Sequence, residues 1–463
     1  MNEGSKGSPS HDGSPVGHAA GISRVRVQAA IAALSARPRV HALVAPVVQP
    51  LAADVASALG VDISMTDDAQ AVRAMAGAAD ALTINLGMLA DSRFETAKVL
   101  ANAGPPFLLD PVKVDRSAPR LALAQELLQQ SPAIVKGNAA EMAVLGQLPR
   151  SAVTVTTGPT DRVNAGRQRY DLNNGHRLLD AVTGTGCAAG VVLSALLGAG
   201  ASSFDATVAG LSLMNCAAER AAKVSHGPGS FKIAWLDALA AISAEEIAAD
   251  MVWRYGTPDL SVYLIVGPEH GDGLAVAQRA VEGGVSLVQY RDKSGSTQEQ
   301  VAAVRRLVEG LTVPVLVNDR ADVAVAAGAA GVHVGHGDLT PWQARELVGA
   351  ERIVGVTVHS MDEAEEFDGA PIDYASVGGV FVTTSKHNPN PPIGMDGFRR
   401  ISARLRQAHD VPICAIAGID AARAAELAAA GADGVAVISA ITSANDPAVA
   451  AANLSAAIAG GRT

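Results

Sequence analysis

The sequence has little cysteine and no excess of basic charge. Its 463 residues contain three cysteines, Cys187, Cys216 and Cys414, which lie far apart and form no CxxC pair. Such an odd, scattered set argues against a disulfide framework and against a structural zinc site, and it fits a reducing cytoplasm. Because 46 acidic residues outnumber 36 basic ones, the composition gives no indication of nucleic-acid binding.

A segment long and apolar enough to span a membrane is also missing. Residues 181–203 carry no charge, but the glycines that open this run leave about 15 residues of helix, short of the roughly 20 that a bilayer requires. We therefore expect a buried core helix here. The N-terminus is polar and lacks the apolar stretch of a signal peptide, and so we predict a cytoplasmic protein with no membrane partner.

Apolar residues, in contrast, are abundant, and the chain is long enough for two domains. It is 49% hydrophobic and 18% charged, which excludes a disordered or coiled-coil chain. Residues 1–22 are rich in Gly, Ser and Pro and are expected to form a disordered tail. A charged helical segment followed by Tyr-Gly-Thr-Pro indicates a linker over 243–260. The two domains are then expected at 23–242 and 261–463.

The first domain shows short apolar runs near 81–85, 107–110, 133–136 and 153–156. They alternate with Ala- and Leu-rich helical stretches, which predicts an α/β domain with a parallel sheet and crossover helices.

The second domain repeats the pattern more regularly. Its eight apolar runs lie near 262–266, 285–290, 313–317, 330–334, 353–357, 373–377, 412–416 and 434–438. Eight strands with helices between several of them predict a (β/α)8 barrel, although an open doubly wound sheet gives a similar pattern. Polar residues follow strands two to eight, and in such barrels the carboxyl ends of the strands carry the active site.

Charged side chains of both signs follow the early strands of this barrel. Gln289, Arg291 and Lys293 alternate at the end of strand two, so their side chains leave on one side and suit an anion such as phosphate. Asp319 and Asp338 follow strands three and four, and such carboxylates beside phosphate ligands normally hold Mg2+. The same residues could instead be surface charges at the strand ends or side chains that cap loops.

The last strands point to a second anion site. Strand six runs into a hydroxyl-rich loop, 378–386, that ends in a lysine and resembles a phosphate-closing lid. Strands seven and eight end near 415–419 and 437–441, where backbone amides of such barrels often form a phosphate cradle.

Taken together, the motifs Gln-x-Arg-x-Lys, Asn-Asp-Arg, Gly-x-Asp, Thr-x-x-Lys and Ile-Ser resemble thiamine-phosphate synthase. That family joins hydroxymethylpyrimidine diphosphate to hydroxyethylthiazole phosphate and releases pyrophosphate. The resemblance implies that pyrophosphate is bound by Gln289, Arg291, Lys293, Asn318 and Lys386. Of these, it gives Arg291, Lys293 and Lys386 catalytic roles. It implies Mg2+ binding by Asp319 and Asp338, a substrate contact by Thr357, and thiazole-phosphate binding by Thr383, Ser385, Gly418, Ile438 and Ser439.

The strongest motif of the first domain is Thr-Gly-Thr-Gly-Cys at the start of the uncharged helix. Gly184, Gly186 and Gly190 would let backbone amides approach an oxyanion, but their spacing is not the dinucleotide fingerprint. Close helix packing is the alternative reading. Asp110 and Glu141 follow two strands and could organise Mg2+ and nucleotide phosphates.

These motifs, which extend from Val40 to about Leu239, resemble hydroxyethylthiazole kinase. This ribokinase-like enzyme uses ATP to phosphorylate hydroxyethylthiazole and so makes the thiazole phosphate. The resemblance implies a homo-oligomer, a trimer with sites between subunits. It places Cys187 at the catalytic position, Met65 at the substrate, Asp110 and Glu141 at Mg2+, and Arg120, Lys136, Thr157, Gly184 and Gly186 at the nucleotide. A thiol is a poor base unless its pKa is lowered, so positioning is expected to matter more.

Several positions depart from these families. His336, Thr357, Ser385 and Ala417 replace Gln, Ser, Thr and Gly in the second domain. In the first domain Lys113 and Ala165 replace Gly and Asp, and the thiazole-recognising end is altered at Ala45, Pro50, Asp54 and Asp62. The main hypothesis is a bifunctional enzyme, kinase then synthase. The alternatives are a synthase fused to an inactive kinase fold with an oligomerisation or sensing role, and an unrelated phosphate-binding barrel.

Overall fold

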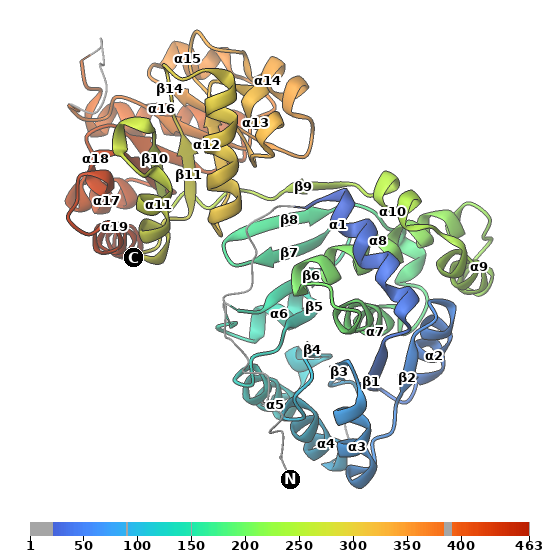
Figure 1. Cartoon of the computed structure of the whole chain (residues 1–463). Coiled ribbons are helices and arrows are strands. Elements are labelled where there is room, and N and C mark those ends of the chain that lie inside the picture. Colours follow the sequence, from blue (N-terminus) through green and yellow to red (C-terminus); the bar gives the residue numbers. More distant parts are fainter. Residues whose placement is uncertain (1–21, 89–90, 150, 384–390, 463) are drawn as a thin grey trace, which may run out of the picture.

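The computed structural model describes residues 22–88, 91–149, 151–383 and 391–462, and within them the chain forms one open sheet and one closed barrel (Figure 1). The tail expected over 1–22 lies, except for Ile22, outside the described residues. No helix in the described part of the chain is long and apolar enough to cross a membrane.

The first sheet has nine strands among the described residues, in the order β2-β1-β3-β4-β5-β6-β7-β8-β9. Its first six strands run parallel, which confirms the predicted parallel sheet. The strands are β1 (Arg39–Leu43), β2 (Asp62–Ser64), β3 (Ala81–Asn85), β4 (Phe107–Asp110), β5 (Ile134–Asn138), β6 (Val153–Thr157), β7 (Asp161–Ala165), β8 (Gln168–Leu172) and β9 (Trp253–Tyr255).

The last three strands differ from the expectation of a purely parallel sheet. β7, β8 and β9 pair antiparallel, each with the strand before it in the sheet. Buried residues alternate with more exposed ones along β7, so this strand lacks the continuous apolar run that marked the buried parallel strands. That is why the sequence pattern did not reveal it.

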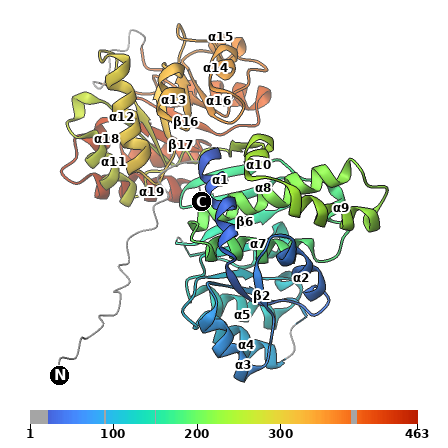
Figure 2. The same cartoon turned by 45° about the vertical axis from the view of Figure 1, so that its right-hand side comes forward.

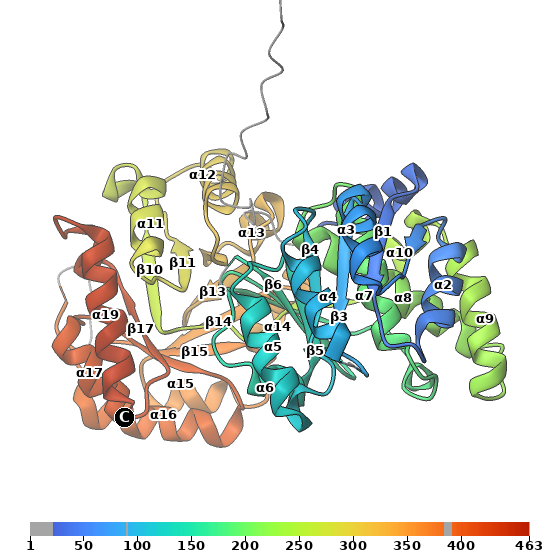
Figure 3. The same ribbon diagram turned by 90° about the horizontal axis from the view of Figure 1, so that it is seen from below.

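Helices cover both faces of this sheet (Figure 3). The uncharged helix expected after residue 181 is α7, and ten of its residues are buried, as predicted for a core helix. The helices are α1 (Arg24–Ala32), α2 (Gln49–Ala58), α3 (Ala69–Ala78), α4 (Asp91–Ala101), α5 (Ala118–Leu128), α6 (Ala139–Val144), α7 (Thr185–Gly198), α8 (Ser203–Ala222), α9 (Pro228–Ala241) and α10 (Ala244–Asp250).

The second half is a closed barrel of eight parallel strands, β10 to β17, in which β17 pairs with β10. This confirms the predicted barrel and excludes the open sheet. The strands are β10 (Val262–Val266), β11 (Leu287–Tyr290), β12 (Val315–Asn318), β13 (Gly331–Val334), β14 (Ile353–Val358), β15 (Tyr374–Val377), β16 (Ile413–Ile416) and β17 (Gly434–Val437). The helices are α11 (Gly273–Glu282), α12 (Thr297–Gly310), α13 (Ala321–Ala327), α14 (Pro341–Val348), α15 (Met361–Glu366), α16 (Gly394–Ala408), α17 (Ala421–Ala429), α18 (Ser439–Thr442) and α19 (Pro447–Gly461).

The segment 243–260, expected as a linker, contains α10 and β9, and β9 completes the first sheet. Figure 2 shows the two parts side by side, each with its own sheet. Arg167, in the turn between β7 and β8, faces Asp259 with Nη1 and Oδ2 3.6 Å apart. The backbone N–H of Tyr255 donates to the carbonyl of Glu351 just before β14. Both contacts lie at the amino ends of the barrel strands.

Candidate active sites

The polar residues expected at the mouth of the barrel line one cavity of about 170 Å³. They come from the carboxyl ends of β11, β12, β13 and β14, as the alternation of strands and polar residues predicted. The predicted residues that line it are Gln289, Arg291, Lys293, Asn318, Asp319, Asp338, Thr357 and Ile438.

Two carboxylates, one ammonium group and one guanidinium group define the charge of this cavity. Burial raises the pKa of Asp319, Asp338 raises it further, and Lys293, which contacts the Asp319 carboxylate, opposes the shift. Asn318 Nδ2 is buried with no hydrogen-bond partner among the described residues. Two facing carboxylates suit a divalent cation, because it would remove their mutual repulsion, and Mg2+ prefers such oxygen ligands.

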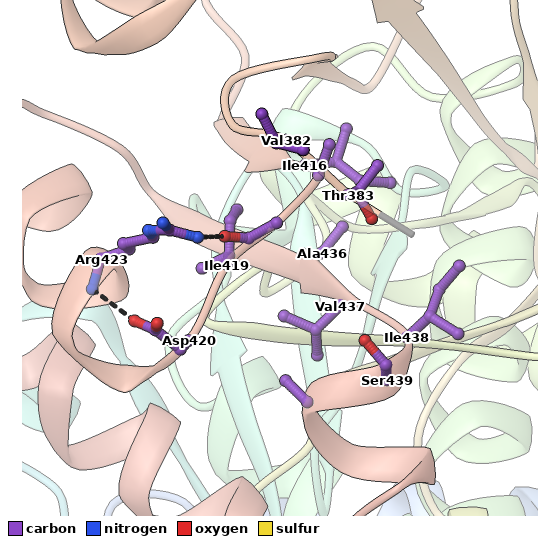
Figure 4. Close-up of a pocket in the computed structure, with 13 residues that line it drawn as sticks. Val382, Thr383, Ile416, Ile419, Asp420, Arg423, Ala436, Val437, Ile438 and Ser439 are labelled. Carbon is purple, nitrogen blue, oxygen red and sulfur yellow. Dashed lines mark hydrogen bonds between the residues drawn. The ribbon is translucent and has the colours of Figure 1, made fainter. Parts of the chain in front are cut away.

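A second cavity, of about 320 Å³, lies beside the first at the ends of β16 and β17 (Figure 4). It is lined by four of the predicted phosphate-site residues, Thr383, Gly418, Ile438 and Ser439. Gly418 has a φ of 66°, and a Cβ there would approach the carbonyl oxygen of Val382 to 2.2 Å, so a glycine is required. The predicted Ser385 and Lys386 lie outside the described residues.

The two cavities share a wall made by Ile416 and Ile438. Ligands in the two cavities would therefore lie next to each other, as a reaction between two bound molecules requires.

The sequence reasoning missed polar residues at the first cavity: Tyr263 and His333 line it, and Tyr374 contacts both of them. Tyr263, His333 and Tyr374 are buried in the barrel and hydrogen-bonded to one another. A tyrosine or histidine inside an apolar strand is the signal that could have found them, because a buried polar group needs a partner.

In the first half, β4, β5 and α7 bring Asp110, Lys136 and Cys187 together. Lys136 Nζ lies 3.2 Å from Asp110 Oδ2, and both side chains are buried. Asn85, at the end of β3, donates from Nδ2 to the same oxygen at 2.8 Å. In the sequence, Asn85 was considered only as the last residue of the apolar run 81–85. A polar side chain at the end of that run was the signal that could have indicated a site residue.

Burial dominates the proton equilibria of this cluster. It raises the pKa of Cys187 to about 11, with Asp110 adding to the shift and Lys136 opposing it, so the thiol is neutral at physiological pH. Burial also raises the pKa of Asp110. For Lys136, burial works against the ammonium form, but Asp110 and the neighbouring Cys187 and Glu141 raise the pKa overall.

The glycines at and near the start of α7 have different roles. Gly184 precedes the helix with a φ of 95°, a conformation that favours glycine. A Cβ on Gly190 would lie 3.4 Å from Leu108 and 3.5 Å from Thr83, so this glycine allows close packing on the sheet. A Cβ on Gly186 would meet nothing within 4 Å, which leaves open space at the helix start.

Glu141 and Thr157 lie near the cluster through the ends of β5 and β6. Glu141 accepts the backbone N–H of Asn138 in a capping box and that of Lys113, both at 2.9 Å. Thr157 pairs with Asn138 across the sheet.

Arg120 and Met65 have no direct contact with Asp110, Lys136 or Cys187 among the described residues. Arg120 lies on α5 and donates to the Val112 carbonyl at 3.5 Å. Met65 follows β2 and packs against the hydrophobic core.

Two family models match the chain. The hydroxyethylthiazole kinase family matches residues 31–152 and 148–245, and thiamine monophosphate synthase matches residues 262–441. A thiamine biosynthesis bifunctional protein of Symbiobacterium thermophilum is 35% identical over 90% of this chain and 94% of its own length.

Single-domain relatives match each half separately. A probable hydroxyethylthiazole kinase of Agrobacterium fabrum is 41% identical and covers 46% of this chain and 87% of its own length. A thiamine-phosphate synthase of the same organism is 48% identical and covers 36% of this chain and 77% of its own length. These matches favour a synthase over an unrelated phosphate-binding barrel, and they give no support to the alternative of an inactive kinase fold.

Proposed function

The chain belongs to the family of bifunctional thiamine-biosynthesis proteins, and from this premise we propose that its two halves catalyse consecutive reactions. The first half transfers a phosphoryl group from ATP to hydroxyethylthiazole. The second half joins the thiazole phosphate to hydroxymethylpyrimidine diphosphate, which yields thiamine phosphate and pyrophosphate.

The observation that carries the synthase proposal is the convergence of cations and carboxylates on one cavity beside a second one. The diphosphate is bound by Gln289, Arg291, Lys293 and Asn318, together with Lys386. As the C–O bond to the diphosphate breaks, its electron pair leaves with the diphosphate, and these donors stabilise the growing negative charge. The thiazole nitrogen then forms the new C–N bond to the pyrimidine methylene carbon. Asp319 and Asp338 would hold Mg2+, which when bound would supply further positive charge to the leaving group.

The second cavity binds the thiazole phosphate in this proposal. Thr383 and Ser439 offer hydroxyl groups, and the glycine at 418 lets the backbone approach the ligand. Ser385 and Ile438 complete the set that the family resemblance implies.

For the kinase, the supporting observation is the buried cluster of Asp110, Lys136 and Cys187. The nucleotide is bound by Lys136, Thr157, Arg120, Gly184 and Gly186. Asp110 and Glu141 would hold its Mg2+, and Met65 contacts the thiazole. Because the Cys187 thiol is neutral, it positions the acceptor alcohol by a hydrogen bond and does not remove its proton.

We further propose a cytoplasmic homo-oligomer, a trimer with kinase sites between subunits. The three cysteines are free thiols, which agrees with a reducing compartment. Light scattering of the full chain measures the subunit number, and a monomer would contradict this part.

The full chain, supplied with Mg2+, ATP and hydroxyethylthiazole, should form ADP and thiazole phosphate. Supplied with both synthase substrates, it should release pyrophosphate. Arg291→Ala should abolish the second reaction and spare the first, whereas Arg306→Ala, on the surface of α12, should affect neither. If the chain shows no ATP-dependent phosphorylation while the synthase is active, the inactive-kinase alternative is correct.

A further inference from the structure

Three elements around the second cavity meet at one arginine, Arg423 (Figure 4). Arg423 lies in the first turn of α17 and lines this cavity. Its Nη1 donates to the carbonyl oxygen of Gly418, just after β16. Its guanidinium carbon lies over the ring of Phe381, 4.6 Å from the centroid, in the segment after β15. Arg423 therefore joins α17, the end of β16 and the segment after β15.

The backbone of Arg423 is fixed as well as its side chain. Asp420 precedes α17, and its Oδ1 accepts the backbone N–H of Arg423 at 3.0 Å. The guanidinium forms no ion pair with any residue that the structure describes. No carboxylate there competes with the Gly418 carbonyl and the Phe381 ring for this cation.

The turn that Arg423 contacts has a strained backbone. Ala417 has a φ of 95° although it is not a glycine, and Gly418 follows with a φ of 66°. An alanine is disfavoured in this region and stays there only where its surroundings determine its conformation. Two contacts do so here. The N–H of Phe381 donates to the carbonyl of Ala417 at 3.2 Å, and Arg423 donates to the carbonyl of the next residue.

The same turn carries two backbone N–H groups without an acceptor. In the described part of the chain nothing accepts the N–H of Gly418 or of Ile419, and Ile419 is 7% exposed. A buried N–H needs a partner, and both residues line the second cavity, so an oxygen of a ligand there would supply one.

The arginine and this ligand contact opposite edges of one peptide group. The N–H and the C=O of a trans peptide point in opposite directions. The guanidinium on the Gly418 carbonyl therefore lies on the side away from the N–H of Ile419. This placement favours an indirect role for Arg423 over a direct bond to the ligand.

We propose that Arg423 is a positioning residue for the phosphate of the thiazole substrate. It keeps the turn of Ala417 and Gly418 left-handed and so presents two N–H groups to a phosphate monoester. This inference rests on the proposed synthase function and deepens it, because the residues that the family resemblance implies for this phosphate do not include Arg423.

Arg423→Gln removes the guanidinium, and the turn can then relax from its strained conformation. Because phosphate binding must restore that conformation, we expect the KM for thiazole phosphate to rise about tenfold. The kcat and the KM for the pyrimidine diphosphate should stay within about twofold. An equal rise in both KM values would show general damage to the barrel and contradict the proposal.

Arg399→Gln is the matched control for the loss of an arginine. Arg399 lies on α16, pairs with Asp396 and lines neither cavity. Both of its KM values should equal those of the wild type.

Ala417→Gly separates positioning from direct binding. Glycine adopts a φ of 95° without strain, so the turn no longer depends on the guanidinium. Ala417→Gly in the Arg423→Gln chain should bring the KM for thiazole phosphate back to within about threefold of the wild type. If the double variant is as impaired as Arg423→Gln alone, the arginine binds the phosphate directly and the proposal is wrong.

Thermal unfolding of the full chain gives a readout that needs no activity. Ala417→Gly relieves strain in the wild type and should raise the unfolding temperature. In the Arg423→Gln chain the turn is already relaxed, so the same substitution should raise it by about half as much or less. Equal increases in the two chains would overturn the proposal. If the wild type makes no thiamine phosphate, the proposed function fails, and this coupling still decides whether Arg423 holds the turn.

Discussion

Lys136 and Asp110 form an ion pair inside the first domain, with Nζ and Oδ2 3.2 Å apart and both side chains almost fully buried. Each charge is tolerated there because the other is present, since an unpaired buried charge is costly.

Lys136→Met should therefore affect stability as well as catalysis. It leaves Asp110 unpaired, and we expect the free energy of unfolding to fall by about 3 kcal/mol and kinase activity to be lost. Lys98→Met, which breaks a surface pair with Glu126, should leave the free energy of unfolding nearly unchanged and keep both activities. Denaturant titration and the two assays measure these effects. Equal destabilisation by the two variants would contradict the importance of burial.

The pH profile of the kinase tests the role of Cys187. Burial raises the pKa of this thiol to about 11, above its ordinary 9.0, so the neutral form predominates below pH 9. We expect no thiol ionisation in the rate between pH 7 and 9, and Cys187→Ser to keep the rate within about tenfold, since a hydroxyl also donates a hydrogen bond. An inflection near pH 8.5 that disappears in Cys187→Ser would show a thiolate mechanism instead.

Ala417 is a non-glycine residue in the left-handed region, with a φ of 95°, where the synthase family usually has Gly. Ala417→Gly should raise the free energy of unfolding by about 0.5–1 kcal/mol, because relief of the strained conformation exceeds the entropy cost of glycine. Ala428→Gly, inside α17, should instead lower it by about 1 kcal/mol. Thermal unfolding of the full chain compares them, and a loss of stability in Ala417→Gly would refute the strain argument.

The junction predicts how the intermediate moves. The β7–β8 turn and β9 contact the barrel at the amino ends of its strands, while both candidate sites lie at carboxyl ends. We expect thiazole phosphate to pass through solution. A one-to-one mixture of Lys136→Met and Arg291→Ala chains should then make thiamine phosphate from the thiazole alcohol as fast as an equal number of wild-type sites. A shorter lag in the wild type would indicate direct transfer.

Much of this fold could be predicted because apolar runs mark buried parallel strands. All eight barrel strands fall within one or two residues of the expected runs, and their carboxyl ends bring Gln289, Lys293 and Asp319 to one cavity. The antiparallel β7 to β9 could not be predicted in this way, because their half-buried alternation is weak and β9 lies in a segment that resembled a linker.

The missed site residues share another reason. Asn85, Tyr263 and Tyr374 each hydrogen-bond to a residue of another strand. The polar side chain was visible in each apolar run, but the pattern of a single strand does not identify its partner. Only the folded barrel brings Tyr263 on β10 next to Tyr374 on β15. The roles predicted for the site residues remain predictions, and Ser385 and Lys386 also lie outside the described part of the chain.

Ile416 and Ile438 separate the two barrel cavities, and each touches both. The size of these two side chains therefore determines how closely the ligands of the two cavities can approach each other. A smaller side chain at either position would join the two cavities and leave the distance between their ligands less well defined. A larger side chain would keep the two ligands apart. Two aliphatic side chains that take no part in the chemistry therefore set the distance between the reacting molecules.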